Sequence, residues 1–458
     1  MDRRRFLIGA AWAGLASGLA LVTGRCAPNP LPRAPASQVP TPTDSPFDGA
    51  PPSLPPVGSP PASAIPSRSS RISKENERRG TRDWDVRSVG RQGAHGFLSR
   101  QSAAPGESVA LHVSCGSRYD VSWYRLGWYG GAGGRLMRVD RDLASSPGMP
   151  PTVVAETGLI EEPWAPALVF DIPADWASGM YLAVLRPVAG GTGYVPFIVR
   201  PGIGSPAPVL FVNAAATWQA YNSWGGANLY DASMPDSPLV SNGRRAVQVS
   251  FDRPYLLDAG SGFQRRWELQ FVRWQEREGR DVDYVADIDL ELHPDVVAGR
   301  RLIVFPGHHE YWTRPMRATL EQAVAAGVNV AFLSSNEIYW QARLEPSGLG
   351  PARRLTCYKS AALDPFATSQ PALTTCRWRE APVSEPEATL VGQMYGHIVR
   401  RPADWVVGTA DHWLYEGTGL RDGDHLVNLV GQEYDTYFAE FAPPGTAILA
   451  RGPVDAVI

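Results

Sequence analysis

A short run of apolar residues without any charge, Leu302–Phe305, constrains the fold more than any other feature of this chain. Such a run is typical of a strand that is buried on both faces of a parallel sheet. It ends at Pro306-Gly307, and the residues that follow read H-H-E-Y (308–311). Ligands of open α/β sheets bind beyond the carboxyl ends of the strands. The sequence therefore places two imidazoles, a carboxylate and a phenol, which bind metals or transfer protons, where a ligand is expected.

The second half of the chain alternates between predicted strands and predicted helices. Three further segments have strand-like patterns, namely Val209–Val212, Val282–Val285 and Val328–Leu333. Helical spacing of apolar residues predicts helices over Gly262–Glu278 and Arg314–Ala326, each followed by a glycine. Strands that alternate with helices are typical of a parallel sheet. We therefore expect an α/β domain of catalytic type, with a mostly parallel sheet, over residues 204–458.

Residues 83–203 have a different pattern, in which short β-rich segments are separated by Gly and Pro. The predicted strands are Ser108–Ser114, Tyr119–Tyr129, Ala167–Asp171, Met180–Leu185 and Tyr194–Val199. Short strands at this spacing are typical of a β-sandwich. The fold class that we expect is therefore mixed, with an immunoglobulin-like β-sandwich followed by the α/β domain.

The amino terminus has the pattern of an export signal. Residues 2–7 read D-R-R-R-F-L, which matches the twin-arginine motif, and the apolar run Ile8–Val22 is too short for a typical membrane span. We expect a twin-arginine signal over residues 1–26 and a proline-rich disordered linker over residues 27–82. The folded part is then periplasmic or extracellular, either free or tethered to the membrane. Arg25 disfavours lipidation of Cys26; this modification and removal of the signal are left open.

Composition excludes some classes of partner. The net charge of the chain is −3, which does not favour binding to nucleic acid. Outside the cytoplasm disulfides are allowed, and the sequence leaves open whether Cys357 and Cys376 pair. Cys115 lies in a predicted strand and is expected to be a buried thiol.

Polar residues follow three of the predicted parallel strands. They occur at Asn213 and Thr217–Asn222, at His308–Glu310, and at Ser334–Glu337. Each cluster taken alone is compatible with a helix cap, a solvated loop or ordinary packing. Because parallel strands bring their carboxyl ends to one edge, the three clusters together favour a functional site. No G-x-S-x-G, H-E-x-x-H, P-loop or G-x-G-x-x-G motif is present, and His, Glu, Tyr and Asn side chains suit a Lewis-acid metal.

Five segments of the second half resemble those of one known family. They read V-L-F-V-N-A-A-A-T-W-Q-A-Y-N-S-W-G-G (209–226), F-D-R-P-Y (251–255), P-G-H-H-E-Y-W (306–312), S-S-N-E-I-Y-W (334–340) and V-G-Q-E-Y-D (430–435). Together with Y-R-L-G-W-Y-G-G (124–131) they resemble the large (β) subunit of N,N-dimethylformamidase and its relatives. The resemblance spans roughly residues 85–440. It implies a catalytic domain similar to glutamine amidotransferases, without their cysteine nucleophile.

The resemblance also implies a mononuclear iron, which we expect to be ferric, bound by two tyrosines and one glutamate. The residues that match these metal ligands are Tyr221, Tyr255 and Glu310. The residues that match the catalytic positions of the family are His308, Asn336 and Glu433. Phenolate and carboxylate are hard anionic donors, which suit ferric iron. Glu433 would act as a general base, and His308 and Asn336 would orient the substrate or stabilise the developing oxyanion.

The sequence therefore predicts an exported, iron-dependent amidohydrolase that acts on a non-peptide C–N bond of a small amide, of the formamide type. A small subunit and a second copy of the chain are the partners that we consider. The first alternative is a non-catalytic extracytoplasmic protein that binds a ligand or a carbohydrate on the same scaffold. The second is a glycosidase that uses Glu310 and Glu433 as its two carboxylates. The physiological substrate is left open.

Overall fold

The computed structural model describes residues 71–86, 93–202, 204, 206–230, 245–256, 264–431 and 433–454. The predicted signal and most of the predicted linker lie outside these residues. The described chain begins with helix α2 (Arg71–Asn76), in which Ile72 and Glu75 are buried. The disorder that was predicted up to residue 82 therefore does not extend over this helix. Within the described residues, no helix combines the length and the apolar character needed to cross a membrane.

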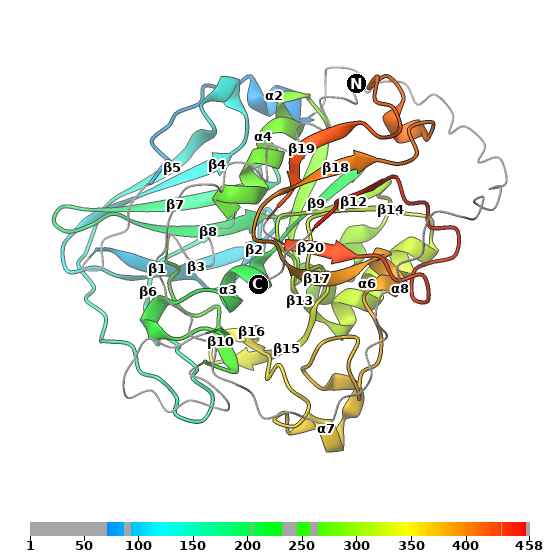
Figure 1. Cartoon of the computed structure of the whole chain (residues 1–458). Helices are drawn as coiled ribbons and strands as arrows, with labels where there is room; N and C mark the ends of the chain where they lie inside the picture. Colours follow the sequence, from blue (N-terminus) through cyan, green and yellow to red (C-terminus); the bar gives the residue numbers. More distant parts are fainter. Residues whose placement is uncertain are drawn as a thin grey trace. The chain divides into compact units, whose positions relative to one another are not determined.

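Two sheets pack into a β-sandwich in the first half of the described chain (Figure 1). The three-stranded sheet has the order β1 (His95–Leu98), β3 (Ser108–Ser114), β6 (Pro166–Asp171). The five-stranded sheet has the order β2 (Ser102–Ala103), β8 (Gly193–Val199), β7 (Gly179–Pro187), β4 (Tyr119–Leu126), β5 (Gly134–Leu143). All pairs are antiparallel except β2 with β8. The five strands predicted for this region are all present.

The three central strands of the five-stranded sheet, β8, β7 and β4, are buried on both faces. Side chains alternate between the two faces of a strand, and in β7 Tyr181, Ala183 and Leu185 pack against the three-stranded sheet. The alternate residues of β7 pack in a second core that contains Phe211 of strand β9 and Leu269 of helix α4; they are Met180, Leu182 and Val184. The sandwich thus shares one of its faces with the α/β part of the chain.

The α/β part contains the predicted parallel sheet (Figure 1). Its strands have the order β11 (Val282–Ala286), β9 (Val209–Asn213), β12 (Leu302–Pro306), β14 (Asn329–Leu333), and every pair is parallel. The predicted helices correspond to π-helix η3 (Gln264–Glu268) with α4 (Leu269–Arg277), and to α6 (Arg314–Ala325). At the start of α6, the Thr313 hydroxyl accepts a hydrogen bond from the Met316 N–H (3.2 Å), which caps the helix. The finer immunoglobulin-like and glutamine amidotransferase-like topologies stay predictions.

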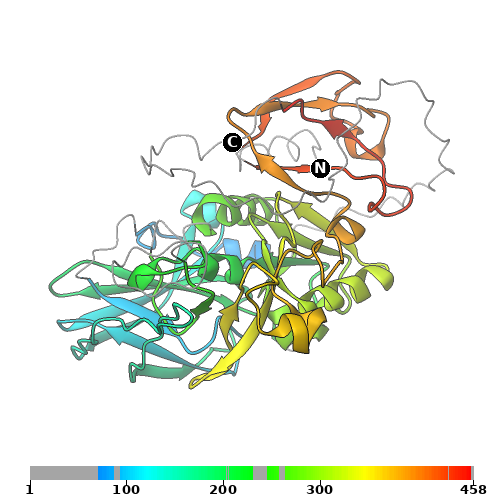
Figure 2. The same cartoon turned by 60° about the horizontal axis from the view of Figure 1, so that its bottom comes forward.

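The remaining strands form three smaller sheets (Figure 2). One has the order β10 (Gln248–Ser250), β16 (Gly350–Thr356), β15 (Trp340–Ser347), β13 (Tyr311–Thr313). The other two are β17 (Met394–Ile398) with β20 (Glu433–Thr436), and β19 (His425–Val430), β18 (Ala403–Val407), β21 (Ala450–Arg451). The short helices are η1 (Tyr129–Gly131), α3 (Ala215–Ala220), η2 (Trp224–Gly226), α5 (Asp289–Leu292), η4 (Pro294–Val297), α7 (Phe366–Ser369), η5 (Pro371–Leu373), α8 (Ala388–Val391) and η6 (Trp413–Tyr415).

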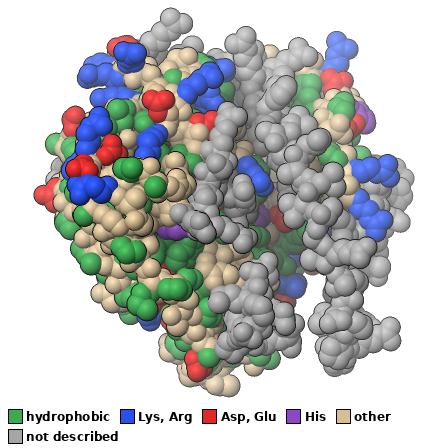
Figure 3. All heavy atoms as spheres, turned by 90° about the vertical axis from the view of Figure 1, so that its left-hand side faces the viewer, with side chains coloured by type: hydrophobic (Ala, Val, Ile, Leu, Met, Phe, Trp, Pro, Cys, Tyr) green, Lys and Arg blue, Asp and Glu red, His purple; other side chains and the backbone are tan. Residues whose placement is uncertain are grey.

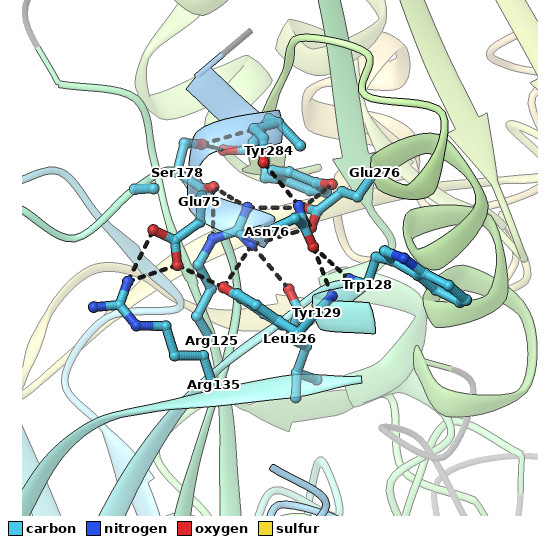
Figure 4. A network of polar contacts seen from close by, with 12 residues as sticks. Glu75, Asn76, Arg125, Leu126, Trp128, Tyr129, Arg135, Ser178, Glu276 and Tyr284 are labelled. Carbon is cyan, nitrogen blue, oxygen red and sulfur yellow. Dashed lines mark hydrogen bonds and ion pairs between the residues drawn. The ribbon is translucent and has the colours of Figure 1, made fainter. Parts of the chain in front are cut away.

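A buried ion pair joins the sandwich to the α/β part (Figure 4). Arg125 of β4 donates two hydrogen bonds to the carboxylate of Glu276 in α4, at 2.7 and 3.2 Å, and both side chains are completely buried. Tyr284 of β11 and Asn76 of α2 donate to the same carboxylate, at 2.8 and 2.9 Å. A buried charge is tolerated when it is paired and its hydrogen bonds are satisfied. Three separate parts of the chain, namely α2, β4 and the consecutive elements α4 and β11, therefore meet at one carboxylate.

The described cysteines are buried free thiols. The Cys357 Sγ lies 3.6 Å from the carbonyl oxygen of Gln341, and the Cys376 Sγ lies 3.9 Å from that of Glu380, so the pairing that the sequence left open is not formed. Burial raises the pKa of the Cys357 thiol to about 12 and that of Cys376 to about 11, which leaves both thiols protonated at neutral pH. The prediction that Cys115 is a buried thiol is confirmed.

The surface carries charges of both signs. On the face shown in Figure 3, Lys and Arg side chains lie beside Asp and Glu side chains, and hydrophobic side chains are scattered among polar ones. One exposed ion pair joins Arg141 of β5 to Asp120 of β4 at 3.3 Å. Exposed pairs of this kind contribute little to stability because water screens them.

Candidate active site

The carboxyl ends of three parallel strands deliver most of the predicted site residues. β9 leads into α3 and Tyr221, β12 leads through Gly307 to His308 and Glu310, and β14 leads to Asn336. Gly307 has a φ of 98°, and a Cβ atom there would lie 3.1 Å from the Cγ of Glu268. Only glycine makes this turn without strain or crowding. The turn after β12 is thus built to lead directly from a buried strand into the site.

Glu310 is the centre of the cluster and is 2% exposed. Its Oε2 accepts a hydrogen bond from the Tyr221 hydroxyl at 2.8 Å. Its Oε1 accepts one from the Tyr230 hydroxyl and another from the Trp340 indole N–H at 3.0 Å. The Glu310 N–H donates to the Thr217 hydroxyl at 3.0 Å, which fixes the backbone beside α3. Two phenol oxygens and both carboxylate oxygens are therefore within hydrogen-bonding reach of one another.

The two phenols reach the same carboxylate because the chain folds back between them. Gly225 and Gly226 have φ values of 80° and 102°, which are readily adopted by glycine, and they turn the chain within η2. The rings of Tyr221 and Tyr230 then stack, with centroids 4.2 Å apart and an interplanar angle of 24°. The structure thus presents both hydroxyls from one short segment.

Tyr255 is not part of this cluster. Its hydroxyl donates to the Gln101 side-chain oxygen at 3.2 Å, and its ring packs in the core between the sandwich and the α/β part. It lies beyond β10, whereas Tyr230 lies in the turn that directly follows η2. The structure therefore brings together Tyr221 and Glu310 from the predicted ligand set. The tyrosine that accompanies them is Tyr230, which the motif order did not identify.

His308 lies between two carboxylates. Its Nε2 is 3.4 Å from the Oε2 of Glu310, and its Nδ1 is 3.8 Å from the Oε2 of Glu433 on β20. Burial alone would lower the pKa of His308, but the hydrogen bond and charge of Glu310, with the charges of Glu433 and Asp435, outweigh burial and raise it. The imidazole can therefore carry a proton between the two carboxylates.

His309 has a different role from its neighbour. Its Nε2 lies 3.2 Å from the carbonyl oxygen of Pro306, and its ring packs edge-on against Phe305. Burial lowers its pKa to about 3, so the ring is neutral at physiological pH. His309 supports the turn, and His308 is the imidazole that contacts Glu310.

Asn336 and Glu433 also meet at the site. The side chain of Asn336 is close enough to the carboxyl of Glu433 to lower its pKa, and the Asn336 backbone N–H donates to Asp435 at 2.8 Å. Burial and the charge of Glu310 raise the pKa of Glu433, while the charge of His308 opposes the shift. The catalytic residues predicted from the sequence, His308, Asn336 and Glu433, therefore lie in one connected group around Glu310.

Lys359 is a charged neighbour that the sequence analysis did not single out. Its Nζ lies 3.2 Å from the ring centroid of Tyr230, 5.0 Å from that of Trp340 and 5.3 Å from that of Tyr311. Burial lowers the pKa of this ammonium to about 8, although the charge of Glu310 opposes the shift. The sequence did contain a signal, because Lys359 is one of only two lysines in an arginine-rich chain.

Electrostatics couple the phenols to the carboxylate. Burial and the charge of Glu310 raise the pKa of both Tyr221 and Tyr230, so each hydroxyl keeps its proton and donates it to Glu310. Burial would raise the pKa of Glu310, but His308, Lys359 and Tyr230 outweigh it and lower the pKa. A cation bound among these oxygens would replace the two hydroxyl protons, because phenolates next to a carboxylate repel one another without a counter-charge.

The donor set fits a hard cation. It consists of two phenol oxygens and a carboxylate, all directed at the same small volume, with an imidazole at its edge. Oxygen donors of this kind suit ferric iron better than soft metals. Within the described residues, no group of three or more His, Cys, Asp or Glu side chains has the arrangement of a metal site. The set found here differs in composition, since phenols supply two of its three groups.

One family model matches most of the chain. The model of the family described as N,N-dimethylformamidase beta subunit-like, C-terminal, matches residues 120–457, which is well over half of the chain. The chain therefore belongs to the N,N-dimethylformamidase β subunit-like family. The matched residues include Tyr221, Tyr230, Glu310 and the whole of β20.

Other comparisons give only distant similarities. No curated protein matches the chain. A superoxide reductase (neelaredoxin) from Ignicoccus hospitalis is 12% identical, with a TM-score of 0.15 over 24% of this chain and 80% of that chain. The sporulation control protein Spo0M from Bacillus subtilis is 15% identical, with a TM-score of 0.17 over 25% and 50%. A cycloisomaltooligosaccharide glucanotransferase from Paenibacillus sp. is 13% identical, with a TM-score of 0.16 over 29% and 17%. Scores this low carry no argument about function.

Proposed function

We propose that this chain is an exported, iron-dependent hydrolase that cleaves a non-peptide C–N bond in a small amide of the formamide type. Family membership supports the general class of hydrolase, because the description of the family names a dimethylformamidase. The observation that carries the proposal is the convergence of Tyr221 and Tyr230 on the two oxygens of Glu310. Export is supported by the twin-arginine pattern at residues 2–7.

The three oxygen-donating groups of Tyr221, Tyr230 and Glu310 would hold the metal. Ferric iron bound there would supply Lewis acidity toward the carbonyl oxygen of an amide. Trp340 would hold one carboxylate oxygen in place through its indole N–H, and Thr217 would fix the backbone of Glu310. These contacts would limit movement of the carboxylate, which is the kind of support that a precise site needs.

The neighbouring side chains supply proton transfer and orientation. Glu433 would act as the general base and take a proton from the water that attacks the amide carbonyl carbon. His308, which faces both Glu310 and Glu433, would pass that proton on to the amine that leaves as the C–N bond breaks. The side-chain amide of Asn336, next to Glu433, would donate a hydrogen bond to the oxygen of the substrate. In this assignment each predicted catalytic residue performs the role expected from its chemistry.

A part of the proposal concerns fold and assembly. The parallel sheet order, in which β9 and β12 are central, supports a glutamine amidotransferase-like domain, and the two facing sheets support an immunoglobulin-like sandwich. The family takes its name from a β subunit, and so we include a small subunit, or a second copy of the chain, among the partners. Measurement of the mass of the purified assembly would distinguish these two arrangements.

The test combines metal analysis with activity. We expect the purified full chain to contain close to one iron and to release amines from small formamides or acylated amines. Glu310→Gln and Tyr221→Phe should lose most of this iron. Glu291→Gln is the matched control, because that carboxylate accepts a hydrogen bond from Thr313 and not from the two phenols. Folded wild-type protein with neither iron nor amide hydrolysis would overturn the proposal.

The same experiment separates the alternatives. Sugar binding by a folded, iron-free and inactive chain would support a non-catalytic binding protein. Hydrolysis of aryl glycosides that survives removal of metal would support the two-carboxylate glycosidase. The structure disfavours the second alternative, because both oxygens of Glu310 already accept hydrogen bonds from tyrosines.

A further inference from the structure

The backbone of the loop after β14 has an unusual conformation. Asn336 has a φ of 62° and Ile338 has a φ of 53°, although neither is glycine. Asparagine tolerates this left-handed region better than most residues, and a β-branched residue such as isoleucine adopts it only under constraint. Something in the surrounding structure must therefore hold the loop.

Two hydrogen bonds hold it. The Ile338 N–H donates to the carbonyl oxygen of His309 at 3.0 Å. The Asn336 N–H donates to the Oδ1 of Asp435 at 2.8 Å. The first bond joins the loop to the neighbouring turn of the parallel sheet, whereas the second comes from β20, far along the chain.

Strand β20 presents two carboxyl groups to the site. Residues two apart on a strand point to the same side, and Glu433 and Asp435 of β20 are two apart. Glu433 lies 3.8 Å from the Nδ1 of His308, and the side chain of Asn336 is close enough to its carboxyl to lower its pKa. Asn336 is thus held at its backbone by Asp435, and its side chain lies beside Glu433 of the same strand.

The second oxygen of Asp435 lies among other acidic groups. Its Oδ2 is buried without a hydrogen-bond partner, and so is the Oε2 of Glu337, whose other oxygen accepts from Ser334 at 2.7 Å. Burial, with the charges of Glu387 and Glu433, raises the pKa of Asp435 to about 7, while Asn336 and Arg379 oppose the shift. Burial and the charge of Asp435 raise the pKa of Glu337. The carboxyl of Asp435 is costly to keep buried, which argues that it is retained for a purpose other than stability.

We propose that Asp435 is a positioning residue for the amide hydrolysis proposed above: by holding the Asn336 N–H, it fixes the left-handed backbone that presents the Asn336 side chain between Glu433 and the substrate. In the described structure Asp435 makes no hydrogen bond to the phenols or to Glu310, so its effect on the geometry of the site passes through Asn336, while its charge also contributes to the raised pKa of His308. The inference rests on the proposed function and adds a residue to it that neither the motifs nor the family comparison assigned.

Three variants of Asp435 test the hydrogen bond. In Asp435→Asn an amide oxygen still accepts the Asn336 N–H, so kcat/KM for a formamide should stay within about threefold of wild type. In Asp435→Ala the acceptor is lost, and kcat/KM should fall by about tenfold or more, since a misplaced donor costs that order of rate. Asp435→Glu keeps the charge but displaces the acceptor by one methylene, and it should behave like the alanine variant. Iron content should be unchanged in all three, because the metal donors are not touched.

The chain offers a matched control in the same C-terminal region. The carboxyl of Asp404 accepts from the N–H of Asn428 at 2.9 Å, and Asn428 is also left-handed, with a φ of 56°. Asp404 lies on β18 and contacts none of the site residues named above, so Asp404→Ala should leave kcat/KM at the wild-type level. A loss of activity in this control equal to that of Asp435→Ala would overturn the proposal, since the effect would then be structural.

The outcomes separate this inference from the proposed function. An inactive, iron-free wild-type chain overturns both. An active wild-type chain with an equally active Asp435→Ala variant overturns only the role of Asp435. If Asp435→Ala does not fold, the asparagine and glutamate variants decide: high activity with asparagine and low activity with glutamate supports positioning, and the reverse order, or equal activity, overturns it.

Discussion

The ammonium of Lys359 lies 3.2 Å from the ring centroid of Tyr230, directly beside the phenol that donates to Glu310. An ammonium over a phenol ring is attracted by the negative face of the ring. Its positive charge also favours the phenolate over the phenol. In a chain with only two lysines, this placement makes Lys359 part of the environment that sets how readily Tyr230 gives up its proton.

Replacement of Lys359 should strengthen iron binding. Ferric iron that displaces two phenol protons adds one positive charge close to this ammonium, and Lys359→Met removes the ammonium but keeps much of the volume. We therefore expect the affinity for ferric iron to rise by roughly tenfold, which corresponds to about 1.4 kcal/mol. Competition with a chelator measures this affinity. Lys74→Met is the control, because this other lysine is exposed on α2. Equal iron affinity in both variants would contradict a role for Lys359 at the site.

The two candidate tyrosines predict different iron contents. Tyr230→Phe removes a hydroxyl that contacts Glu310, and we expect it to lose most of the bound iron. Tyr255→Phe removes a hydroxyl that contacts Gln101, and we expect it to keep its iron. Each change deletes one buried phenol oxygen, so the pair controls for the chemistry of the substitution. Loss of iron in Tyr255→Phe alone would restore the ligand assignment made from the motif order.

The stability of the contact between the sandwich and the α/β part should depend strongly on the buried ion pair of Arg125 and Glu276. Arg125→Met leaves the carboxylate of Glu276 buried without its cation, and we expect the free energy of unfolding to fall by about 3–5 kcal/mol. Chemical denaturation measures this loss. Arg277→Ala, which breaks an exposed pair with Glu278, should change stability very little. Adding Glu276→Leu to Arg125→Met should recover part of the loss, since the unpaired charge is then removed.

A buried carboxyl away from the site predicts a pH dependence of stability. Glu162 is 4% exposed, and burial raises its pKa from the ordinary 4.5 to about 7. The folded chain therefore binds this proton more tightly than the unfolded chain, and its contribution to stability is lost as the pH rises between these two values. In Glu162→Gln this loss should be absent. The variant should gain stability over the wild type progressively between pH 4.5 and about 7, and hold the gain above pH 7.

Unfolding curves at several pH values test this expectation. Glu156→Gln is the control for the loss of one negative charge, because Glu156 is exposed in the same region. A difference in the free energy of unfolding between Glu162→Gln and wild type that stayed constant across the range would contradict the expectation. It would show that the Glu162 carboxyl has the same pKa in the folded and the unfolded chain.

Much of the fold could be predicted because its signals are local. The strand at Ser108–Ser114 has the predicted bounds, and β12 differs from its prediction by one residue. The apolar run at Leu302–Phe305 is too short for a typical helix and is followed by Pro-Gly, which together favour a buried strand, and Gly279 and Gly327 follow the helices where expected. The sheets formed by residues 394–451 were not predicted, because most residues of their strands are only half-buried and the strands lack a clear alternation.

The site was harder to predict because its contacts are not local. The order of motifs placed Tyr221, His308, Glu310 and Asn336 correctly near one another, since parallel strands share one edge. It did not distinguish Tyr230 from Tyr255, because that choice depends on how the chain turns within η2. The double glycine at 225–226 was the available signal for that turn. The motif at residues 430–435 placed Glu433 at the site with Asn336, but it did not indicate that Asp435, two residues further on, would hold the Asn336 backbone.

The double-sided burial of the central strands of the five-stranded sheet has a practical consequence for work with this chain. Met180, Leu182 and Val184 on its inner surface contribute to the same core as Phe211 and Leu269. Cutting the chain between the sandwich and the α/β part would expose a large apolar surface on each fragment, which favours aggregation. Shortened versions made for crystallisation, or chimeras that exchange the amino-terminal half between relatives, should therefore keep the two apolar surfaces together.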